Sequence, residues 1–363
     1  MPRRQFHHSQ FSSRKQALRV FAALVAVSAF LAQATLSGQT PEPTSNTWAV
    51  RIVLPARVVA GQRGTLAVLG VDGRLAPNVT IELGSGQRVT TDATGRALFA
   101  APSTGGVLVA KASGVSAAAL VDSTGPEDTA TPESLSLATV ASLREPFSIC
   151  GRRFRPDADL NHVRLNGEPA LVMASSPECL AVLPNAKTAP GMAKISVQTP
   201  SGQWTSQVTL VSLEPQFPRP ALVPGEKGHL FVNLLGSDQP LRVAVGNQTP
   251  GVLRFVKGDA QELTTTGGAQ NFASVEVEAI QSGDFSLGAQ LLPPPDEDAA
   301  QRYLEAAVSL ADKAVQRDLD RLSKELGRHP RNLDQLRRSL NSILAETTAG
   351  DFRILVAAAR TSL

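Results

Sequence analysis

The sequence predicts a mainly β protein, in which tandem β-sandwich domains precede a C-terminal α-helical segment. Between residues 48 and 292, short runs rich in Val, Leu and Ile alternate with turns rich in Gly, Pro and Asp, which is the pattern of small antiparallel sandwiches. From residue 296 onward, apolar residues instead recur every three or four positions, and this spacing indicates amphipathic helices.

The N-terminus has the three parts of a secretory signal peptide. Its first 19 residues carry five basic side chains and no acidic one, and the apolar run VFAALVAVSAFLAQA then ends in Ala32-Gln33-Ala34. Residues 1–34 are therefore predicted to be a signal peptide that is cleaved near Ala34. The alternative is an uncleaved membrane anchor, but the run has 15 residues, whereas a membrane span needs about 20.

Most of the positive charge of the chain belongs to this predicted signal. The formal net charge is +3 at pH 7, and removal of the five basic residues of the signal leaves −2. The charge therefore gives no evidence for a nucleic-acid partner, which would require a basic surface. No later apolar run is long enough to span a membrane, so we expect an exported protein that is periplasmic, cell-surface or secreted.

Stretches rich in Pro and polar residues divide the chain after the signal, because such composition favours extended spacers. The stretches cover residues 35–47, 122–134, 213–225 and 292–298. The resulting blocks are three β-rich ones, at 48–121, 135–213 and 221–292, and a helical one at 296–363. We therefore expect three sandwiches in series, followed by helices.

The first block, 48–121, contains a recurring kind of strand pair. It reads NVTIEL, then TDATGRALFAAP, then GGVLVAKA, and a strand pair that ends in T-D-x-x-G before a small apolar strand resembles the bacterial Ig-like repeats of surface proteins. The resemblance covers about 70 residues and implies an Ig-like β-sandwich. Thr91, Asp92 and Gly95 are predicted turn residues, because Asp can cap its own turn and Gly accepts a positive φ.

The second block, 135–213, carries a more specific set of motifs. I-x-G-x-x-F is followed by N-x-V-x-L-N-G, by A-V-L-P and by P-G-x-x-x-I-S-V-x-T-x-x-G. In this order the motifs resemble the IPT/TIG domain, an Ig-like fold, and the resemblance implies a compact β-sandwich without a fixed activity. The matching residues are Ile149, Gly151, Phe154, Asn161, Val163, Leu165, Gly167, Pro184, Pro190, Gly191 and Gly202.

The third block, 221–292, is also rich in β-like runs, although its residues show no family pattern. The run SVEVEAI alternates, which predicts that Val275, Val277 and Ala279 face a core while the two glutamates between them face solvent. A further sandwich is therefore expected.

The last block, 296–363, has apolar residues at helical spacing. From Leu304 to Leu326 they form a single stripe over about six turns, which predicts one long helix. Capping boxes that begin at Asn332 and at Thr348 predict the starts of two shorter helices. We therefore expect two to three helices, which form a small bundle or fold back on the preceding β-domain.

Cys150 lies beside Arg152 and Arg153, an environment that lowers the pKa of a thiol and can make it reactive. The chain has one other cysteine, Cys179, and two cysteines in an exported protein favour a disulfide. In an Ig-like sandwich the strand that ends at Cys150 and the strand that Cys179 opens can be neighbours. The disulfide is therefore the favoured interpretation; a free buried pair and a catalytic thiol, with His162 as its base, are the alternatives.

Asp157, Asp159 and Asn161 are spaced like the first ligands of an EF-hand calcium loop, and Glu168 has the position of the last ligand. His162 occupies the position at which that loop requires Gly. In addition, an alternating strand would carry Glu168 about 20 Å away from Asn161. These residues are therefore weak candidates for a metal site, a polar turn is the simpler interpretation, and no cofactor is expected.

The sequence favours binding over catalysis. After residue 34 it contains no G-x-S-x-G, H-E-x-x-H or S-x-x-K motif. We therefore expect a non-catalytic binding or structural module of a bacterial surface or periplasm, with a protein or glycan partner. One alternative is an accessory or carbohydrate-binding subunit of an exported enzyme, which Trp48 or Trp204 exposed in a groove would favour. The other is a hydrolase with an unrecognised site.

Overall fold

The computed structural model describes residues 49–123, 135–217, 222–258, 260–328, 332–348 and 350–363. These residues belong to one compact unit, Ser45–Leu363, which is described by itself. The predicted signal peptide, the predicted linker at 35–47 and most of the predicted linker at 122–134 lie outside the described residues. Among the residues described, no helix combines the length and the apolar character that crossing a membrane requires.

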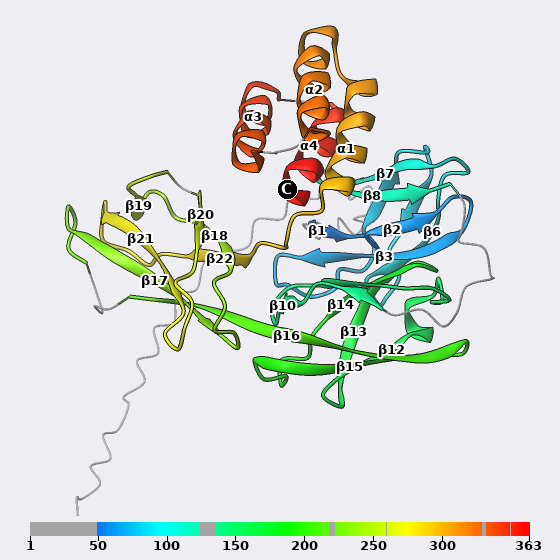
Figure 1. Ribbon diagram of the computed structural model, residues 1–363, viewed down its shortest axis with the longest axis horizontal. Coiled ribbons are helices and arrows are strands. Elements are labelled where there is room, and N and C mark those ends of the chain that lie inside the picture. Colours follow the sequence, from blue (N-terminus) through cyan, green and yellow to red (C-terminus); the bar gives the residue numbers. More distant parts are fainter. Residues whose placement is uncertain (1–48, 124–134, 218–221, 259, 329–331, 349) are drawn as a thin grey trace, which may run out of the picture. The chain divides into compact units, whose positions relative to one another are not determined.

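The first sandwich consists of two facing sheets (Figure 1). Its strands are β1 (Ala49–Val53), β2 (Arg57–Val59), β3 (Arg63–Gly70), β4 (Thr80–Leu83), β5 (Arg88–Thr90), β6 (Arg96–Ala100), β7 (Gly106–Ala112) and β8 (Val115–Asp122). One sheet has the order β1–β3–β6 and the other β2–β8–β7–β4–β5. Alternation along the strands places Leu66, Ile81 and Leu108 between the sheets, where each is at most 1% exposed.

The turn before β6 has the structure that its sequence predicts. The hydroxyl of Thr91 is buried and accepts a hydrogen bond from the N–H of Val79 (2.9 Å). Asp92 accepts from the hydroxyl and the N–H of Thr94, and the hydroxyl bond is the main cause that holds the pKa of Asp92 below its usual range. Gly95 has a φ of 73°, and a Cβ there would lie 2.6 Å from a neighbouring side chain. The three predicted turn residues therefore have structural roles.

The second sandwich confirms an Ig-like arrangement of the motif residues. It contains β9 (Ser136–Leu137), β10 (Val140–Ser142), β11 (Phe147–Cys150), the 3₁₀ helix η1 (Ala158–Leu160), β12 (His162–Leu165), β13 (Glu168–Ser175), β14 (Cys179–Leu183), β15 (Gly191–Thr199) and the first part of β16 (Gly202–Gln216). Strand β13 pairs with β14 in one sheet and with β12 in the other. Ile149, Phe154, Val163 and Leu165 are 0–3% exposed in the core between them.

The second and third sandwiches share strand β16. It pairs antiparallel with β15 over Gly202–Leu210 and then with β17 over Ser212–Gln216. The expected linker at 213–225 is therefore wrong for residues 213–216, which are strand residues. Pro215 fits there because this half of β16 is the edge strand of the sheet that continues through β17. An edge strand tolerates a missing backbone N–H.

The third block is the expected sandwich. With the end of β16, its strands are β17 (Lys227–Leu235), β18 (Arg242–Asn247), β19 (Leu253–Phe255), β20 (Ala260–Thr264), β21 (Phe272–Ala279) and β22 (Leu287–Leu291). One sheet has the order β19–β21–β17–β16 and the other β20–β18–β22. Val275, Val277 and Ala279 are at most 5% exposed in the core, as the alternation in SVEVEAI predicts.

The first and second sandwiches meet at a small core of their own. Strands β3 and β13 pair at one position, where Thr65 lies opposite Ser175. Around this bridge the outward faces of both sandwiches contribute apolar side chains, so these faces are buried against each other. The cluster contains Val53, Ala67, Met173, Ala174 and Ala181, each at most 6% exposed.

In the part of the chain that the structure describes, the C-terminal segment has four helices, one more than the largest number expected. They are α1 (Glu297–Leu310), α2 (Lys313–Leu326), α3 (Leu333–Glu346) and α4 (Asp351–Ser362). The predicted long helix is interrupted at Ala311 and Asp312, whose ψ angles of 149° and 153° are extended. The spacing of the apolar residues does not reveal this break, because α1 and α2 both bury their apolar residues in the same core.

The starts of the last two helices differ in their agreement with the predicted caps. Asn332 caps α3, since its side-chain oxygen accepts from the N–H of Gln335 (3.0 Å). The predicted cap at Thr348 is wrong. Helix α4 begins instead after Gly350, whose φ of 112° suits glycine and which offers no capping side chain.

The helices pack against the first sandwich, which precedes them by almost two hundred residues in sequence. All of them contribute to one core that also contains Val109 of β7 and Leu120 of β8. Arg302 on α1 donates to the carboxylate of Asp122 (2.6 Å) and to the carbonyl oxygen of Val121 (2.9 Å). Asp122, expected as the first residue of a linker, therefore ends β8 and anchors α1.

Helix α4 also contacts the third sandwich. Arg360 on α4 and Arg242 on β18 both bind the carboxylate of Glu262 on β20, the latter at 3.0 Å. The helical segment thus contacts both the first and the third sandwich. The domains from β1 to α4 are therefore in contact with one another and are not independent units in series.

Candidate functional site

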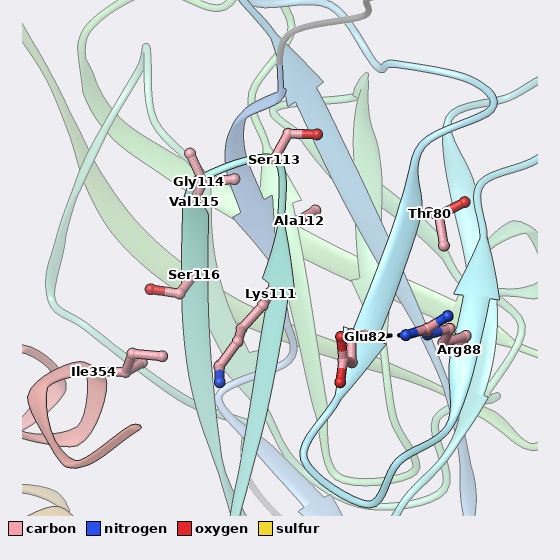
Figure 2. Close-up of a pocket in the computed structure, with 10 residues that line it drawn as sticks. All are labelled: Thr80, Glu82, Arg88, Lys111, Ala112, Ser113, Gly114, Val115, Ser116 and Ile354. Carbon is pink, nitrogen blue, oxygen red and sulfur yellow. Dashed lines mark ion pairs between the residues drawn. The ribbon is translucent and has the colours of Figure 1, made fainter. Parts of the chain in front are cut away.

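A shallow groove of about 450 Å³ lies on the first sandwich, beside α4 (Figure 2). Residues of β4, β5 and the β7–β8 hairpin line it, together with Ile354 of α4. The charged side chains at the groove are paired with each other: Glu82 with Arg88 (3.9 Å), and Lys111 with Asp351 of α4. Because these charges neutralise one another, the groove offers no strong field with which to select an ionic ligand.

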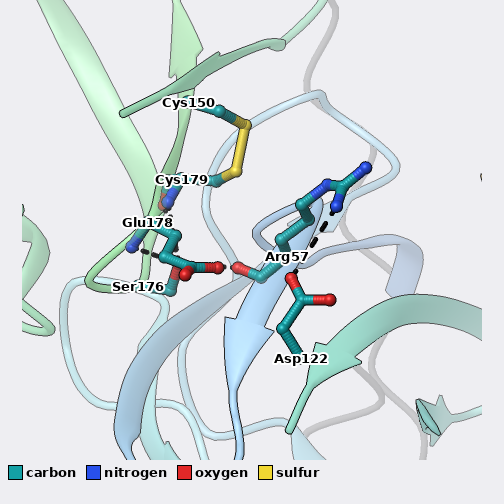
Figure 3. Close-up of a disulfide and its surroundings, with 6 residues drawn as sticks. All are labelled: Arg57, Asp122, Cys150, Ser176, Glu178 and Cys179. Atoms are coloured by element: carbon teal, nitrogen blue, oxygen red, sulfur yellow. Dashed lines mark hydrogen bonds and ion pairs between the residues drawn. A yellow bond between two sulfur atoms is a disulfide. The ribbon is translucent and has the colours of Figure 1, made fainter. Parts of the chain in front are cut away.

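Cys150 and Cys179 form a disulfide, as the sequence predicts (Figure 3). They lie directly opposite each other on the neighbouring strands β11 and β14, with their Cα atoms 4.1 Å apart. Neither sulfur is a free thiol, so the alternatives of a free buried pair and of a catalytic thiol are wrong for this structure.

The disulfide holds the turn between β13 and β14, and this turn contacts the first sandwich. The hydroxyl of Ser176 in the turn accepts from the N–H of Cys179 (2.9 Å). The same hydroxyl donates to the carbonyl oxygen of Arg57 on β2 (2.6 Å). The cysteine pair therefore lies beside a contact between two sandwiches.

Glu178 lies in the same turn (Figure 3). Burial is the main cause that raises the pKa of Glu178, and the charge of Asp122 raises it further, against the opposing effect of Arg57 and Arg152. Asp122 is itself paired with Arg302 at 2.6 Å and with Arg57 at 3.8 Å. This cluster joins the first sandwich, the second sandwich and helix α1.

Glu178→Gln is expected to stabilise the protein progressively as the pH rises. A carboxyl group whose pKa is raised by folding binds its proton more tightly in the folded state. The unfolding free energy of the wild-type protein therefore falls as the pH rises above 4.5, the ordinary pKa of a glutamate. Below that value both states are protonated and the effect is absent. Denaturant unfolding at pH 4, 6 and 8 should show a growing advantage of the variant, and an advantage that is equal at all three pH values would contradict the prediction.

The weak metal candidates Asp157, Asp159 and Asn161 lie in and around η1, and their oxygens bind protein groups. Asp157 accepts from the N–H of Asp159 (3.0 Å), and Asp159 accepts from the guanidinium of Arg96 (2.8 Å). Asn161 is 3% exposed and accepts from the N–H of Arg155 (2.8 Å). These bonds account for the three residues as a polar turn. Within the described ranges, no three His, Cys, Asp or Glu side chains are grouped as metal ligands would be.

Arg96 of the first sandwich binds this turn of the second sandwich across the junction between them. It extends from β6 of the first sandwich and is 9% exposed. One terminal nitrogen donates to Asp159 (2.8 Å) and the other to the carbonyl oxygen of Val172 on β13 (2.7 Å). The hydroxyl of Thr65 adds a bond to the carbonyl oxygen of Pro156 (2.6 Å). A residue that resembled a metal ligand in the sequence is thus part of an interdomain contact.

Arg96→Ala is expected to lower the unfolding free energy by about 2 kcal/mol, because it leaves the Val172 carbonyl without its donor in a buried contact. Asp159 adds little to the loss, since its side chain is 71% exposed and can be hydrated. Arg88→Ala is the matched control, because its pair with Glu82 is 3.9 Å long and both side chains are more than half exposed. Denaturant unfolding should show a change below about 0.5 kcal/mol for the control, and equal losses in the two variants would contradict the prediction.

Trp204 does not form the exposed platform that would favour a carbohydrate-binding subunit. Its ring packs edge-on against Phe154, with the ring centroids 5.7 Å apart, and it is partly buried against the core of the second sandwich. Trp48, the other candidate, lies outside the described residues.

The third sandwich carries a group of ring and amide side chains that the sequence analysis missed. We call it the outer face: Gln216, His229, Phe231, Asn233, Phe272 and Ser274. The run HLFVNLL contains the signal, because Leu230, Val232 and Leu234 are buried and the residues between them must point outward. A phenylalanine in such an outward position is the feature that would have identified the face.

No protein-family model matches the sequence, and no curated protein matches it either. Among solved structures, the chain is similar to SGBP-B of the Bacteroides ovatus mixed-linkage glucan utilization locus, solved with a mixed-linkage heptasaccharide. The identity is 12%, the match covers 70% of this chain and 63% of that one, and the TM-score is 0.18. The chain thus spans less than two thirds of the length of SGBP-B.

Two further solved structures are similar to a comparable degree. The N-terminal four Ig domains of Dscam1 isoform 7.44 are 10% identical, with 66% of this chain and 71% of that chain covered and a TM-score of 0.23. Domains 4 and 5 of the S-layer protein SbsC are 15% identical, with 65% and 86% covered and a TM-score of 0.14. At such low TM-scores these likenesses carry no argument. The strands and helices described above make this a mainly β protein with tandem Ig-like sandwiches and C-terminal helices.

Proposed function

We propose that this chain is an exported, non-catalytic protein of a bacterial periplasm or cell surface, in which the Ig-like sandwiches form a binding or structural scaffold. The observation that carries the proposal is the way in which the domains are joined. The second and third sandwiches share β16, the first and second share a buried core, and the helices contact the first and third. Such contacts suit a protein that presents surfaces to a partner.

The disulfide supports export. A bond between Cys150 and Cys179 persists in oxidising compartments, whereas the cytoplasm keeps thiols reduced. The sequence of residues 1–34 supports the same conclusion, since its basic start, apolar run and A-x-A ending are those of a signal peptide.

We also infer that the second sandwich is an IPT/TIG-like domain. The motif residues Ile149, Phe154 and Val163 are buried in its core, which is the role that a family framework requires. Gly167 and Gly191 have φ angles of 88° and 122°, so these two glycines of the motif occupy positions that other residues avoid.

Binding is favoured over catalysis by an ion pair in each of the two described grooves. Glu82 and Arg88 form an ion pair in the first groove, and Arg96 and Asp159 form one in a smaller groove of about 220 Å³ at the first junction. Charges that are paired with each other support the fold and are less available for proton transfer. A protein or glycan is therefore the proposed kind of partner.

Cell fractionation combined with thiol alkylation tests the proposal. The tagged full chain, expressed in its native cells, is expected outside the cytoplasm and shortened by about the 34 residues of the signal. Its two cysteines should react with an alkylating reagent only after denaturation and reduction. A full-length protein in the cytoplasmic fraction, with both cysteines alkylated without reductant, would overturn export. A resident cytoplasmic protein with free thiols, measured in the same fractions, controls for leakage and for air oxidation.

A further inference from the structure

The outer face of the third sandwich combines aromatic rings with neutral hydrogen-bonding groups. Phe231 on β17 and Phe272 on β21 have ring centroids 5.4 Å apart at an interplanar angle of 75°, so the edge of one ring meets the face of the other. The ring of His229 lies 6.5 Å from that of Phe231. All three side chains are half-buried or exposed, and none belongs to the core of this sandwich. Solvent therefore reaches a short row of rings.

Amide and hydroxyl groups surround this row. Asn233 lies opposite Phe272 in the sheet and donates to the side-chain oxygen of Gln216 (2.7 Å), while Ser274 lies 3.4 Å from the ring nitrogen of His229. Each amide has two N–H donors and a carbonyl with two acceptor sites, so one mutual bond leaves both Asn233 and Gln216 with further capacity. The face can therefore donate and accept hydrogen bonds at the same time, beside an apolar surface.

We propose that this outer face binds a neutral polysaccharide. A sugar hydroxyl both donates and accepts, as amide and imidazole groups do. The C–H groups on one side of a pyranose ring are apolar and weakly positive, and they pack well on the negative face of an aromatic ring. This inference deepens the proposed function, because it requires only that an exported protein meets such a polymer and it names the site.

Charge selects a neutral ligand over an anionic one. Glu214 lies opposite Asn233 on the same side of the sheet, and Glu276 lies opposite His229. At the next position along the sheet the charges are mixed, since Lys227 and Arg254 flank Glu278 and the Arg254 pair is 2.7 Å long. The charges nearest to the rings are therefore acidic, and they would repel phosphate, sulfate and nucleic acid.

The face is too small to be a stable dimer interface. The six residues lie on three strands, which are about 4.8 Å apart and therefore about 10 Å wide together, and the part of β17 from His229 to Asn233 is about 13 Å long. The face therefore covers about 130 Å², whereas each partner in a stable protein interface buries about 800 Å². Two or three sugar rings of a polymer, by contrast, fit within these dimensions.

Native gel electrophoresis of the full chain through soluble polysaccharides tests the proposal. The probes are a β-glucan, a mannan, a galactan and dextran, with dextran sulfate as the charged counterpart of dextran. The protein is expected to be retarded by at least one neutral polymer and not by dextran sulfate. Phe231→Ala and Phe272→Ala should each weaken the retardation by about tenfold or more, as expected for the central contacts of a small site.

Two further variants make the test specific. Phe285→Ala removes a ring of the same size that is 45% exposed and contacts Phe217 instead of the outer face, and it should leave the retardation unchanged. Phe231→Trp keeps a flat ring and should retain binding. Circular dichroism of each variant checks that it is folded.

The proposal is overturned if no neutral polymer retards the wild-type protein, or if both alanine variants are retarded as strongly as the wild type. Dimerisation that Phe231→Ala abolishes would also overturn it, in favour of an interface between copies. An exported, oxidised protein that fails to bind overturns only this inference. A cytoplasmic, reduced protein that binds overturns the export proposed above and leaves the binding face intact.

Discussion

Gly236→Ala is expected to lower the unfolding free energy by about 4 kcal/mol, because two separate effects add. The residue has a φ of 98°, a conformation that costs a side chain about 1–2 kcal/mol. Its added Cβ would also lie 2.3 Å from the carbonyl oxygen of Leu210 and 2.7 Å from the nitrogen of Gly191, and overpacking of this kind costs about 1–3 kcal/mol. Both neighbours belong to the second sandwich, so the substitution acts where the second and third sandwiches meet.

Gly258→Ala is the matched control. Gly258 has nearly the same φ, 96°, but an added Cβ there would have no neighbour within 4 Å. Its loss should therefore be limited to the conformational part, about 1–2 kcal/mol. Denaturant unfolding followed by circular dichroism measures both variants, and equal losses would show that the backbones at Gly236 are not in close contact.

Removal of the disulfide is expected to have an effect almost as large. Cys150 and Cys179 are 29 residues apart in the sequence, and closing a loop of this length stabilises the folded state by about 3–4 kcal/mol in the chain-entropy model. The double variant Cys150→Ala/Cys179→Ala should lose this amount. Because the turn held by the disulfide binds Arg57 through Ser176, the loss should extend to β2 of the first sandwich.

Denaturant unfolding with and without reductant measures the loss of stability, and hydrogen exchange measures whether the loss extends to β2. Reductant should destabilise the wild-type protein by about 3–4 kcal/mol and leave the double variant unchanged. Amide exchange in β2 should become faster in the variant than in the wild type. If exchange changes only in β11 and β14, the disulfide does not support the contact between the sandwiches.

The sequence was sufficient to predict features that depend on local order. The framework of the second sandwich was implied by the resemblance of its motifs to the IPT/TIG domain, and the motif residues Ile149, Phe154 and Val163 are buried in its core. The disulfide followed from the presence of only two cysteines near the ends of neighbouring strands. The turn at Thr91 followed from residues that have few alternative conformations.

Features that depend on contacts distant in sequence could not be predicted. Arg96 binds Asp159, which is 63 positions away in the sequence, and Arg302 binds Asp122, which is 180 positions away. The residues next to either arginine in the sequence therefore do not indicate its partner. Pro215 suggested a linker, but an edge strand accepts it. The break before Asp312 was hidden because an apolar stripe reports only which side of a helix is buried.

The outer face of the third sandwich could be predicted only in part from the sequence. Its residues could have been identified as outward from the alternation around Phe231, but their meeting requires the register between β16, β17 and β21. Gln216 is 15 positions before Phe231, and Phe272 is 41 positions after it. Only the folded sheet brings the amides and the rings together.

One measurement tests most directly whether the sandwiches and helices form a single scaffold. In a Trp48→Phe background, Trp204 is the only tryptophan and reports on the second sandwich, while helical circular dichroism reports on α1–α4. The shared strand, the buried junction and the helix contacts predict one denaturant transition with the same midpoint for both signals. Loss of the helical signal at a lower denaturant concentration, with the Trp204 signal still native, would show that the helices are an independent appendage and would contradict the scaffold.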